Sequence, residues 1–396
     1  MAAHPARTWL IVTGVVLVLV QLVLVLAWWM LPRFAPEWTA QYSPWPEPAL
    51  RAMEHDPDTN NTYGWVTGRL SAWGSDIGPA LRRKFDTSDV SQRQRLLAVG
   101  FEVARRPGVA HGTEISDDPQ AVTAEEVAHL REDLRALILA ALADGSSYLP
   151  VNAAFLAEAL GDREVVPAFC DYLAKQKSPI SDDLESVVHA MGRLGDPRAV
   201  AVLIPLLPIR HKPHPVVDEA LDRCLTKANL PQVLAAMDHA HEVIRQWAAR
   251  QAQHFSDSPV VVSRLSTMLD DQDRYVRIMA IQVLADIRYV DVGARLLDIA
   301  RNEQEDLPVR LQAMETMGFH HDGEALPFLR SQVTSDEREL KLQAITALGM
   351  IPDNESIPRF IELLKSDDVE LVRTVRWSLE RMHLTQEQRR QIGPSP

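Results

Sequence analysis

Apolar and basic residues recur in a fixed order through the second half of the chain. An apolar residue is followed by a basic residue and, three positions later, by a small one, as in Ile244-Arg245 with Ala248. Apolar residues that recur every three or four positions are typical of an amphipathic helix. The basic positions are Arg245, Arg277, Arg310, Lys341 and Arg373, which lie 32, 33, 31 and 32 residues apart. The pattern predicts one helix per repeat, beginning near Ile244, Val276, Val309, Leu340 and Leu371.

Glycine and proline separate these helices from their neighbours. Gly161, Gly195, Gly318 and Gly349 each follow an apolar residue at the predicted end of a helix, and a proline opens the helix that follows. Glycine suits the left-handed conformation of a helix C-cap, and proline suits the first turn of a helix. Each repeat is therefore predicted to hold two helices joined by short turns, which gives an all-α fold of about seven or eight helix pairs.

Three segments carry a family resemblance: 194–207, 270–287 and 368–382. They resemble HEAT repeats, including the shorter HEAT-like units of the phycobilisome lyases. The resemblance implies a right-handed α-solenoid over residues 151–385. In such arrays one helix pair cannot bury its own apolar face, so neighbouring pairs stack and share a core.

The resemblance also implies a ladder of charges. In the family, an acidic residue in the turn of a repeat pairs with the basic residue of the apolar-basic step, often in the neighbouring repeat. Arg245 is the first basic residue of this ladder, and the matching pairs here are Asp273 with Arg277, Asp306 with Arg310, Glu337 with Lys341, and Asp368 with Arg373. We interpret this ladder as structural, since acidic side chains satisfy helix N-termini.

Upstream of the repeats, residues 87–150 are predicted to form a divergent helical cap. Ser88 is expected to cap a helix that runs to Arg105, and a capping box at Thr123 precedes a helix that ends at Ala143. These two helices would close the amino-terminal end of the stack.

The amino terminus carries an apolar run after a short tail, residues 1–8. Residues 9–31 hold 23 residues without a charge, enough for a helix to cross a bilayer. Trp9, Trp28 and Trp29 lie where an interfacial aromatic belt is expected, and Gln21 is the strongly polar exception near the middle. The run predicts a single transmembrane helix.

A cleaved signal peptide is the alternative to this anchor. Its apolar region is usually shorter and ends at a small-x-small site, whereas Ala27 is followed by two tryptophans. Arg7 precedes the predicted span and Arg33 follows it, so the positive charges on its two sides are nearly balanced and do not decide the orientation of the helix in the membrane. The short tail resembles a signal anchor, which places the bulk of the chain outside the cytoplasm, in the periplasm if the source is Gram-negative.

Residues 32–86 follow the predicted span and are expected to form a linker and an irregular segment. Residues 32–48 contain five prolines, which predicts an extended juxtamembrane linker. The segment 55–80 is given no fold. At the other end, residues 386–396 are predicted to be a polar tail.

Charge and cysteine content narrow the function. The net charge of −13 is opposite to that of a general nucleic-acid binder, so nucleic acid is not expected as a partner. The two cysteines, Cys170 and Cys224, are interpreted as buried free thiols, with a disulfide or a metal pair as alternatives.

Candidate catalytic or metal-binding groups are few. The sequence has no P-loop, no GxSxG and no HExxH motif. One HEAT-repeat enzyme family, the deoxyhypusine hydroxylases, binds two irons through several His-Glu dipeptides, and this chain has only His241-Glu242. The segment 320–322 (His-His-Asp) and the pair His211 and His214 are interpreted as turn residues. No catalytic residue, cofactor site or metal site is assigned.

The prediction is a membrane-tethered scaffold for protein–protein interaction, for example an accessory subunit of a larger membrane complex. The second helix of each HEAT pair usually lines the concave side, which makes Gln246, Gln282, Glu315 and Trp377 candidate partner contacts. The alternative is an enzyme or lyase-like activity in the concave groove, and a third possibility is a purely structural spacer.

Overall fold

The computed structural model describes a helical protein over most of the chain. The described residues are 20–21, 23–26, 28, 30–33, 39, 43, 46–55, 66, 73, 76–105, 124–144, 146, 148–176, 181–287, 292–351 and 353–392. Trp9, Trp29 and most other residues of the predicted span lie outside these ranges, as does Thr123 of the predicted capping box. Within the described ranges, no helix combines the length and the apolar character needed to cross a bilayer.

The chain divides into two compact units. Unit 1 contains Met1–Leu206 and His214–Leu225, and unit 2 contains Leu207–Pro213 and Thr226–Pro396. Sheet structure within the described residues is limited to the hairpin of β1 (Pro208–Ile209) and β2 (Lys212–Pro213). Apart from this hairpin, the prediction of an all-α fold of helix pairs is confirmed for the described residues of both units.

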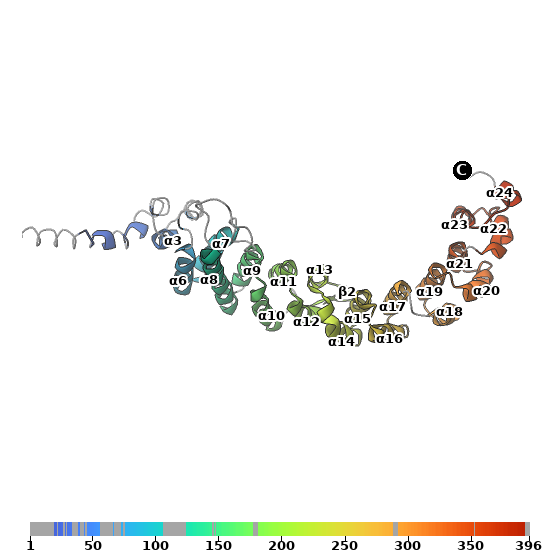
Figure 1. Cartoon of the computed structure of the whole chain (residues 1–396), viewed down its shortest axis with the longest axis horizontal. Coiled ribbons are helices and arrows are strands. Elements are labelled where there is room, and N and C mark those ends of the chain that lie inside the picture. The colour runs from blue at the N-terminus through green and yellow to red at the C-terminus, as the bar shows by residue number, and fades with distance from the viewer. Residues whose placement is uncertain are drawn as a thin grey trace, which may run out of the picture. The chain divides into compact units, whose positions relative to one another are not determined.

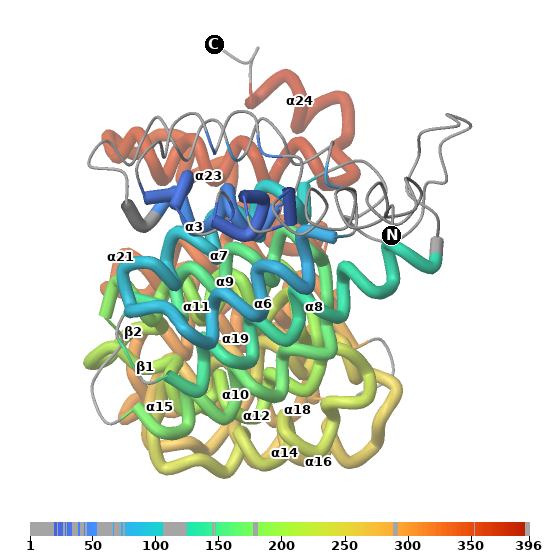
Figure 2. The backbone as a smooth tube through the Cα atoms, turned by 90° about the vertical axis from the view of Figure 1, so that its left-hand side faces the viewer, coloured from blue at the N-terminus to red at the C-terminus, as the bar shows by residue number. Residues whose placement is uncertain are grey.

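Unit 1 is built from two rows of helices (Figure 1). Each first helix packs on the first helix of the next pair, and each second helix does the same. The first row is α6 (Ile77–Thr87), α8 (Ala124–Ala143), α10 (Val166–Ala174) and α12 (Val200–Leu203), and the second row is α7 (Val90–Ala104), α9 (Leu149–Leu160), α11 (Asp182–Leu194) and α13 (Pro215–Cys224). Figure 2, viewed from the end where α6 lies, shows α7, α9 and α11 following one another on the same side.

Unit 2 repeats this arrangement. Its second row packs in sequence, and each of its members also packs on the first helix of its own pair. The first row is α14 (Leu230–Met237), α16 (Pro259–Met268), α18 (Gly293–Arg301), α20 (Leu326–Gln332) and α22 (Ile357–Leu363), and the second row is α15 (Glu242–Gln251), α17 (Arg274–Asp286), α19 (Leu307–Phe319), α21 (Arg338–Met350) and α23 (Val369–Leu379). Every second-row helix begins two residues before its predicted start.

Two of the four predicted glycine caps are correct. Gly161 and Gly195 end α9 and α11 with φ near +63° and +62°, in the left-handed region that glycine tolerates. Gly318 and Gly349 are not caps, because α19 and α21 continue past them to Phe319 and Met350. They lie where second-row helices approach most closely: a Cβ on Gly349 would lie 2.7 Å from the Cα of Ser378. Their role is packing between repeats.

The amino-terminal end of unit 1 is more ordered than the sequence indicates. Within the segment predicted to be linker and irregular, α3 (Pro46–His55) and α6 are helices, and α3 packs on α6. Trp73 is buried, and its indole N–H donates to the Ser43 carbonyl at 3.4 Å. Proline does not prevent a helix here because Pro46 occupies its first position.

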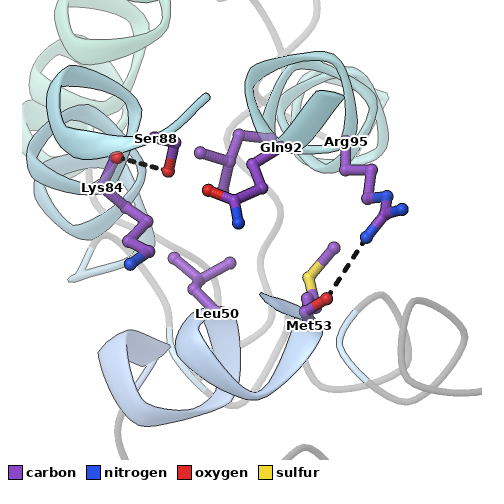
Figure 3. Close-up of a pocket in the computed structure, with 7 residues that line it drawn as sticks. Leu50, Met53, Lys84, Ser88, Gln92 and Arg95 are labelled. Atoms are coloured by element: carbon purple, nitrogen blue, oxygen red, sulfur yellow. Dashed lines mark hydrogen bonds between the residues drawn. The ribbon is translucent and has the colours of Figure 1, made fainter. Parts of the chain in front are cut away.

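Figure 3 shows how α3 meets the two helices that follow. Leu50 and Met53 of α3 point into a small pocket between α6 and α7, and Arg95 of α7 donates to the Met53 carbonyl at 3.3 Å. The prediction that Ser88 caps α7 is wrong, because its hydroxyl donates to the Lys84 carbonyl at 2.8 Å. The cap is Asp89, whose carboxylate accepts from the Gln92 backbone N–H at 2.9 Å. The pocket holds no more than about one water molecule.

The helix predicted to end at Ala143 is α8, which ends there. The polar tail predicted from residue 386 contains a helix, α24 (Gln386–Ile392), none of whose residues is buried. Helix pairing in unit 1 starts before residue 151, since α6 packs with α7 and α8 with α9.

Candidate partner-binding surfaces

Two acidic residues at the start of second-row helices in unit 2 act as helix caps. Asp273 accepts hydrogen bonds from the backbone N–H groups of Tyr275 and Val276, both at 3.0 Å. Asp368 accepts in the same way from Glu370 and Leu371, at 3.0 and 3.1 Å. These bonds satisfy donors that a helix N-terminus otherwise leaves free. Asp273 and Asp368 of the predicted ladder therefore have a structural role as caps, whereas the side chains of Asp306 and Glu337 make no cap bond.

The basic half of the ladder reaches forward to the next repeat. Arg245 forms two hydrogen bonds with the Asp271 carboxylate, both 2.8 Å long. Arg277 contacts Glu305 at 2.6 Å and Asp306 at 2.8 Å. The predicted pair of Asp273 with Arg277 is wrong, because the Arg277 guanidinium extends to the following turn and the Asp273 carboxylate caps its own helix.

The remaining predicted pairs also differ. Arg310 is buried and donates to the Ala300 carbonyl at 3.1 Å instead of pairing with Asp306. Lys341 makes no ion pair with any described residue. Arg338, which the sequence reading missed, contacts Asp368 at 2.9 Å and Glu370 at 2.6 Å. Arg338, at the first position of α21, therefore reaches the cap residue Asp368 of the next repeat, as Arg277 reaches Asp306 from a position one turn further into its own helix.

Arg373 does not belong to the ladder. Arg245, Arg277 and Arg310 each stand four residues after the cap position of their helix and are only 9% exposed. In α23 that position is Val372, and the Arg373 side chain is 80% exposed, 4.0 Å from Glu370. Arg373 stands one residue past the ladder position of α23, which turns its side chain by about 100° around the helix.

The pH dependence of stability tests the Asp368 cap. The hydrogen bond from Arg338, aided by the backbone N–H of Leu371, lowers the pKa of Asp368 to about 2. Since the pKa of an unfolded Asp is about 3.9, the stabilisation is complete above that pH and is lost as the pH falls toward 2. We expect Asp368→Asn to lower the melting temperature at pH 7 and to differ progressively less from wild type between pH 4 and pH 2. A difference that is independent of pH would show that the charge contributes nothing.

Three of the four predicted partner contacts share one line along unit 2. Gln282, Glu315 and Trp377 each stand nine residues after the cap position of α17, α19 and α23. We call these three residues the unit 2 ridge. The amide of Gln282 donates to the Gln312 side chain at 2.9 Å, and Gln312 donates to Glu315 at 3.3 Å, so polar contacts join α17 to α19.

The other features of this surface are more local. Gln246 lies off the ridge, and its amide donates to the Asp273 carboxylate at 3.0 Å, which supports that cap. Trp377 is half-buried, with the Arg381 guanidinium 3.6 Å from the centre of its ring. This stacking leaves Trp377 only partly available to a partner.

His211 and His214 do not share a partner, whereas His211 and His241 both lie next to Glu242. His214 is buried in unit 1 and lies 3.2 Å from Glu185, whereas the exposed His211 contacts Glu242 of unit 2 at 2.8 Å. His241 also lies 3.4 Å from Glu242. Even so, no three acidic, histidine or cysteine side chains in the described part of the chain are placed to hold a metal ion.

The other candidate groups occupy structural positions. His320 and His321 follow the end of α19 and are exposed, and Asp322 accepts from the Glu324 N–H at 3.0 Å. Cys170 is partly exposed rather than buried, Cys224 is buried, and both are free thiols. Burial raises the pKa of each thiol to about 11, which keeps both protonated and unreactive at neutral pH.

Comparison with known proteins agrees with this arrangement. The family model of HEAT repeats matches residues 230–307 and residues 296–380, both in unit 2. No curated protein matches the sequence significantly. The predicted HEAT-like character is thus supported for the second half of the chain.

Three solved structures are similar to the chain at low identity. A chain from the Kap95p–RanGDP structure is 14% identical with a TM-score of 0.45, over 85% of this chain and 50% of that one. This chain therefore spans about half the length of that protein. The CpcE–CpcF complex of phycocyanin lyase from Nostoc sp. is 20% identical with a TM-score of 0.28, over 69% of this chain and 93% of the other. Human deoxyhypusine hydroxylase is 16% identical with a TM-score of 0.28, over 73% and 96%.

Proposed function

We propose that this protein is a membrane-tethered scaffold that binds a protein partner on the second-row helices of unit 2, rather than an enzyme. The observation that carries the proposal is the unit 2 ridge, which places side chains from three repeats in one register on the same row of helices. Such a row offers an extended surface on which one partner can contact several repeats. The negative charge of the chain favours a partner with a basic or neutral face.

The described amino-terminal residues support a tether. Val23, Leu24, Val25 and Leu26 are consecutive helical residues, and their exposed fractions are 63, 58, 60 and 50%. A helix that is apolar on all sides is stable only when lipid or protein surrounds it. With the charge-free run predicted over residues 9–31, we infer a single-pass anchor with the bulk of the chain outside the cytoplasm.

One contact joins this apolar helix to helix α3. The Arg51 guanidinium of α3 lies 5.4 Å from the Trp28 ring, so a described residue of the apolar helix contacts α3. A tether at this end of unit 1 would hold the repeats close to the bilayer. That raises the effective concentration of the scaffold toward a membrane-bound partner.

Purification from native membranes tests the proposal. The tagged full-length chain should sediment with membranes after an alkaline carbonate wash, and mild detergent should extract it with a stoichiometric protein. The double variant Gln282→Lys/Glu315→Lys should lose that protein, because it places two positive charges on the ridge where one side chain is neutral and one is negative. Its matched control, Ser263→Lys/Asp298→Lys, alters exposed positions on first-row helices and should retain it.

Each part of the proposal can fail separately. A chain that the carbonate wash removes from the membrane contradicts the anchor. A partner that both double variants retain contradicts the ridge. A wild-type chain that is extracted alone contradicts the scaffold and favours an activity of its own.

A further inference from the structure

Unit 1 has an open groove of about 610 Å³ at the carboxy-terminal ends of α7, α9 and α11. All three helices belong to the second row, so the groove crosses three consecutive repeats. The side chains that matter for its chemistry are Phe101, Arg105, Phe155, Glu158, His189 and Arg193.

The apolar part of the groove is contributed by two phenylalanines. Phe155 is 48% exposed at the middle of α9, although its neighbours Leu156 and Leu160 are fully buried. Phe101 of α7 lines the same groove and is partly exposed. An aromatic ring that remains half in water retains apolar area that a partner side chain could cover. Two such rings in one groove mark a place for an apolar side chain.

The charged part of the groove is mostly basic. The Arg105 guanidinium lies 5.5 Å from the centre of the Phe101 ring, and Arg193 donates to Glu158 at 3.2 Å. Arg163 also lines the groove, so its charged lining contains three guanidinium groups and one carboxylate, that of Glu158. Arg105 has an acidic neighbour on its own side of the groove, Glu102, at 3.9 Å. The groove keeps a positive excess in a chain whose net charge is −13.

These ion pairs leave the arginines able to bind a partner. The side chains of Arg105 and Arg193 are 62% and 53% exposed. Ion pairs at that exposure contribute little to stability and exchange easily. A guanidinium presents several N–H donors in a plane, which suits a carboxylate better than a lone amine does.

We propose that this groove docks a segment of a partner protein that carries carboxylates beside an aromatic or large aliphatic side chain. The apolar side chain lies against Phe101 and Phe155, and the carboxylates bind Arg105 and Arg193. The inference deepens the proposed scaffold function and rests on it, since it gives one partner segment a chemistry and a position. It differs from the unit 2 ridge, whose polar side chains carry no basic excess.

A phage-displayed library of random 12-residue peptides, selected on the full-length chain, tests this chemistry. The groove variants are Phe155→Ser and Arg193→Glu, both at partly exposed positions where folding should be unaffected. Matched controls are Phe319→Ser and Arg373→Glu, which change the same residue types at exposed positions of unit 2. Melting temperatures equal to that of the wild type establish that all four variants are folded.

The proposal predicts enrichment of peptides that contain Asp or Glu next to Phe, Tyr, Trp or Leu. These peptides should bind each groove variant at least about tenfold more weakly than the wild type and should bind both controls unchanged. Their affinity should also fall as the salt concentration rises. Three results would overturn the proposal: enrichment of basic peptides, binding of the selected peptides to the groove variants that equals their binding to the wild type, or a selection that enriches no peptide preferring the wild type to the groove variants. A partner that is still extracted with a groove variant would leave the scaffold proposal standing while the groove proposal fails.

Discussion

Val309→Asp should destabilise unit 2 by about 3–5 kcal/mol, because the substitution places a carboxyl group in a fully buried position between repeats. Val309 lies in the first turn of α19, which packs on α17, α18 and α21. Burial disfavours the charged form and raises the pKa of the new carboxyl. The loss should therefore grow as the pH rises above about 4, the pKa of an unfolded Asp. Urea unfolding of the full chain at pH 5 and pH 8 measures both effects.

Val369→Asp is the matched control for this experiment. Val369 occupies the first position of α23, where its side chain is 82% exposed. An exposed carboxylate in a first helical turn interacts favourably with the helix dipole, so its effect should stay within about 0.5 kcal/mol. Equal effects of the two substitutions would mean that the repeat register described here is wrong.

Gly349→Leu should destabilise the last repeat by at least about 3 kcal/mol. The Cβ would lie 2.6 Å from the Cβ of Ser378 and 2.7 Å from its Cα, which a change of rotamer cannot relieve. Helices α21 and α23 must move apart, and the bond from the Ser378 hydroxyl to the Ile345 carbonyl, now 2.9 Å long, is strained or lost. Because repeats depend on their nearest neighbours, amide hydrogen exchange should show α23 opening first.

Gly323→Leu controls for the glycine substitution itself. No atom lies within 4 Å of the position that a Cβ on Gly323 would occupy. The variant should therefore unfold like the wild type to within about 1 kcal/mol. Replacing glycine lowers the entropy of the unfolded chain, which by itself stabilises the folded state. An equally large loss at Gly323 would therefore contradict the assignment of the Gly349 effect to contact between α21 and α23.

Local rules were sufficient to place the helices of unit 2. Helix starts depend on cap residues and on the apolar period, and both are visible within one repeat. Each second-row helix consequently begins within two residues of its predicted start. The same reasoning failed at Gly318 and Gly349, because a glycine that ends a helix and one that allows close packing look alike in a single sequence.

Contacts between repeats could not be derived in the same way. Whether Arg277 reaches Asp273 or Asp306 depends on the distance and rotation between neighbouring repeats, which no local pattern encodes. The spacing pattern includes the exposed Arg373, which stands one residue past the ladder position of α23, and omits Arg338, which stands at the first position of α21 rather than at the apolar-basic step. The chemistry of the ladder was predictable, but its connections were not.

The amino-terminal surfaces were the least visible in the sequence. Helix α3 lies in a segment whose prolines predict an extended chain, yet Leu50 and Met53 are buried against α6 and α7. The groove of unit 1 draws its side chains from three repeats, and its most informative residue, Phe155, resembles a core residue in the sequence. Only the packing of α9 shows that this ring faces water.

The most direct test of the scaffold is photocrosslinking in the native membrane from position 282 on α17, compared with position 263 on α16. Both positions are exposed. Position 282 lies on a second-row helix and position 263 lies on the first-row helix of the same pair. The account predicts that a photoreactive residue at 282 forms a crosslink to one defined protein and that the same residue at 263 does not. Crosslinks that are absent from 282, or that form equally from both positions, would contradict the central claim that the second row of unit 2 binds a partner.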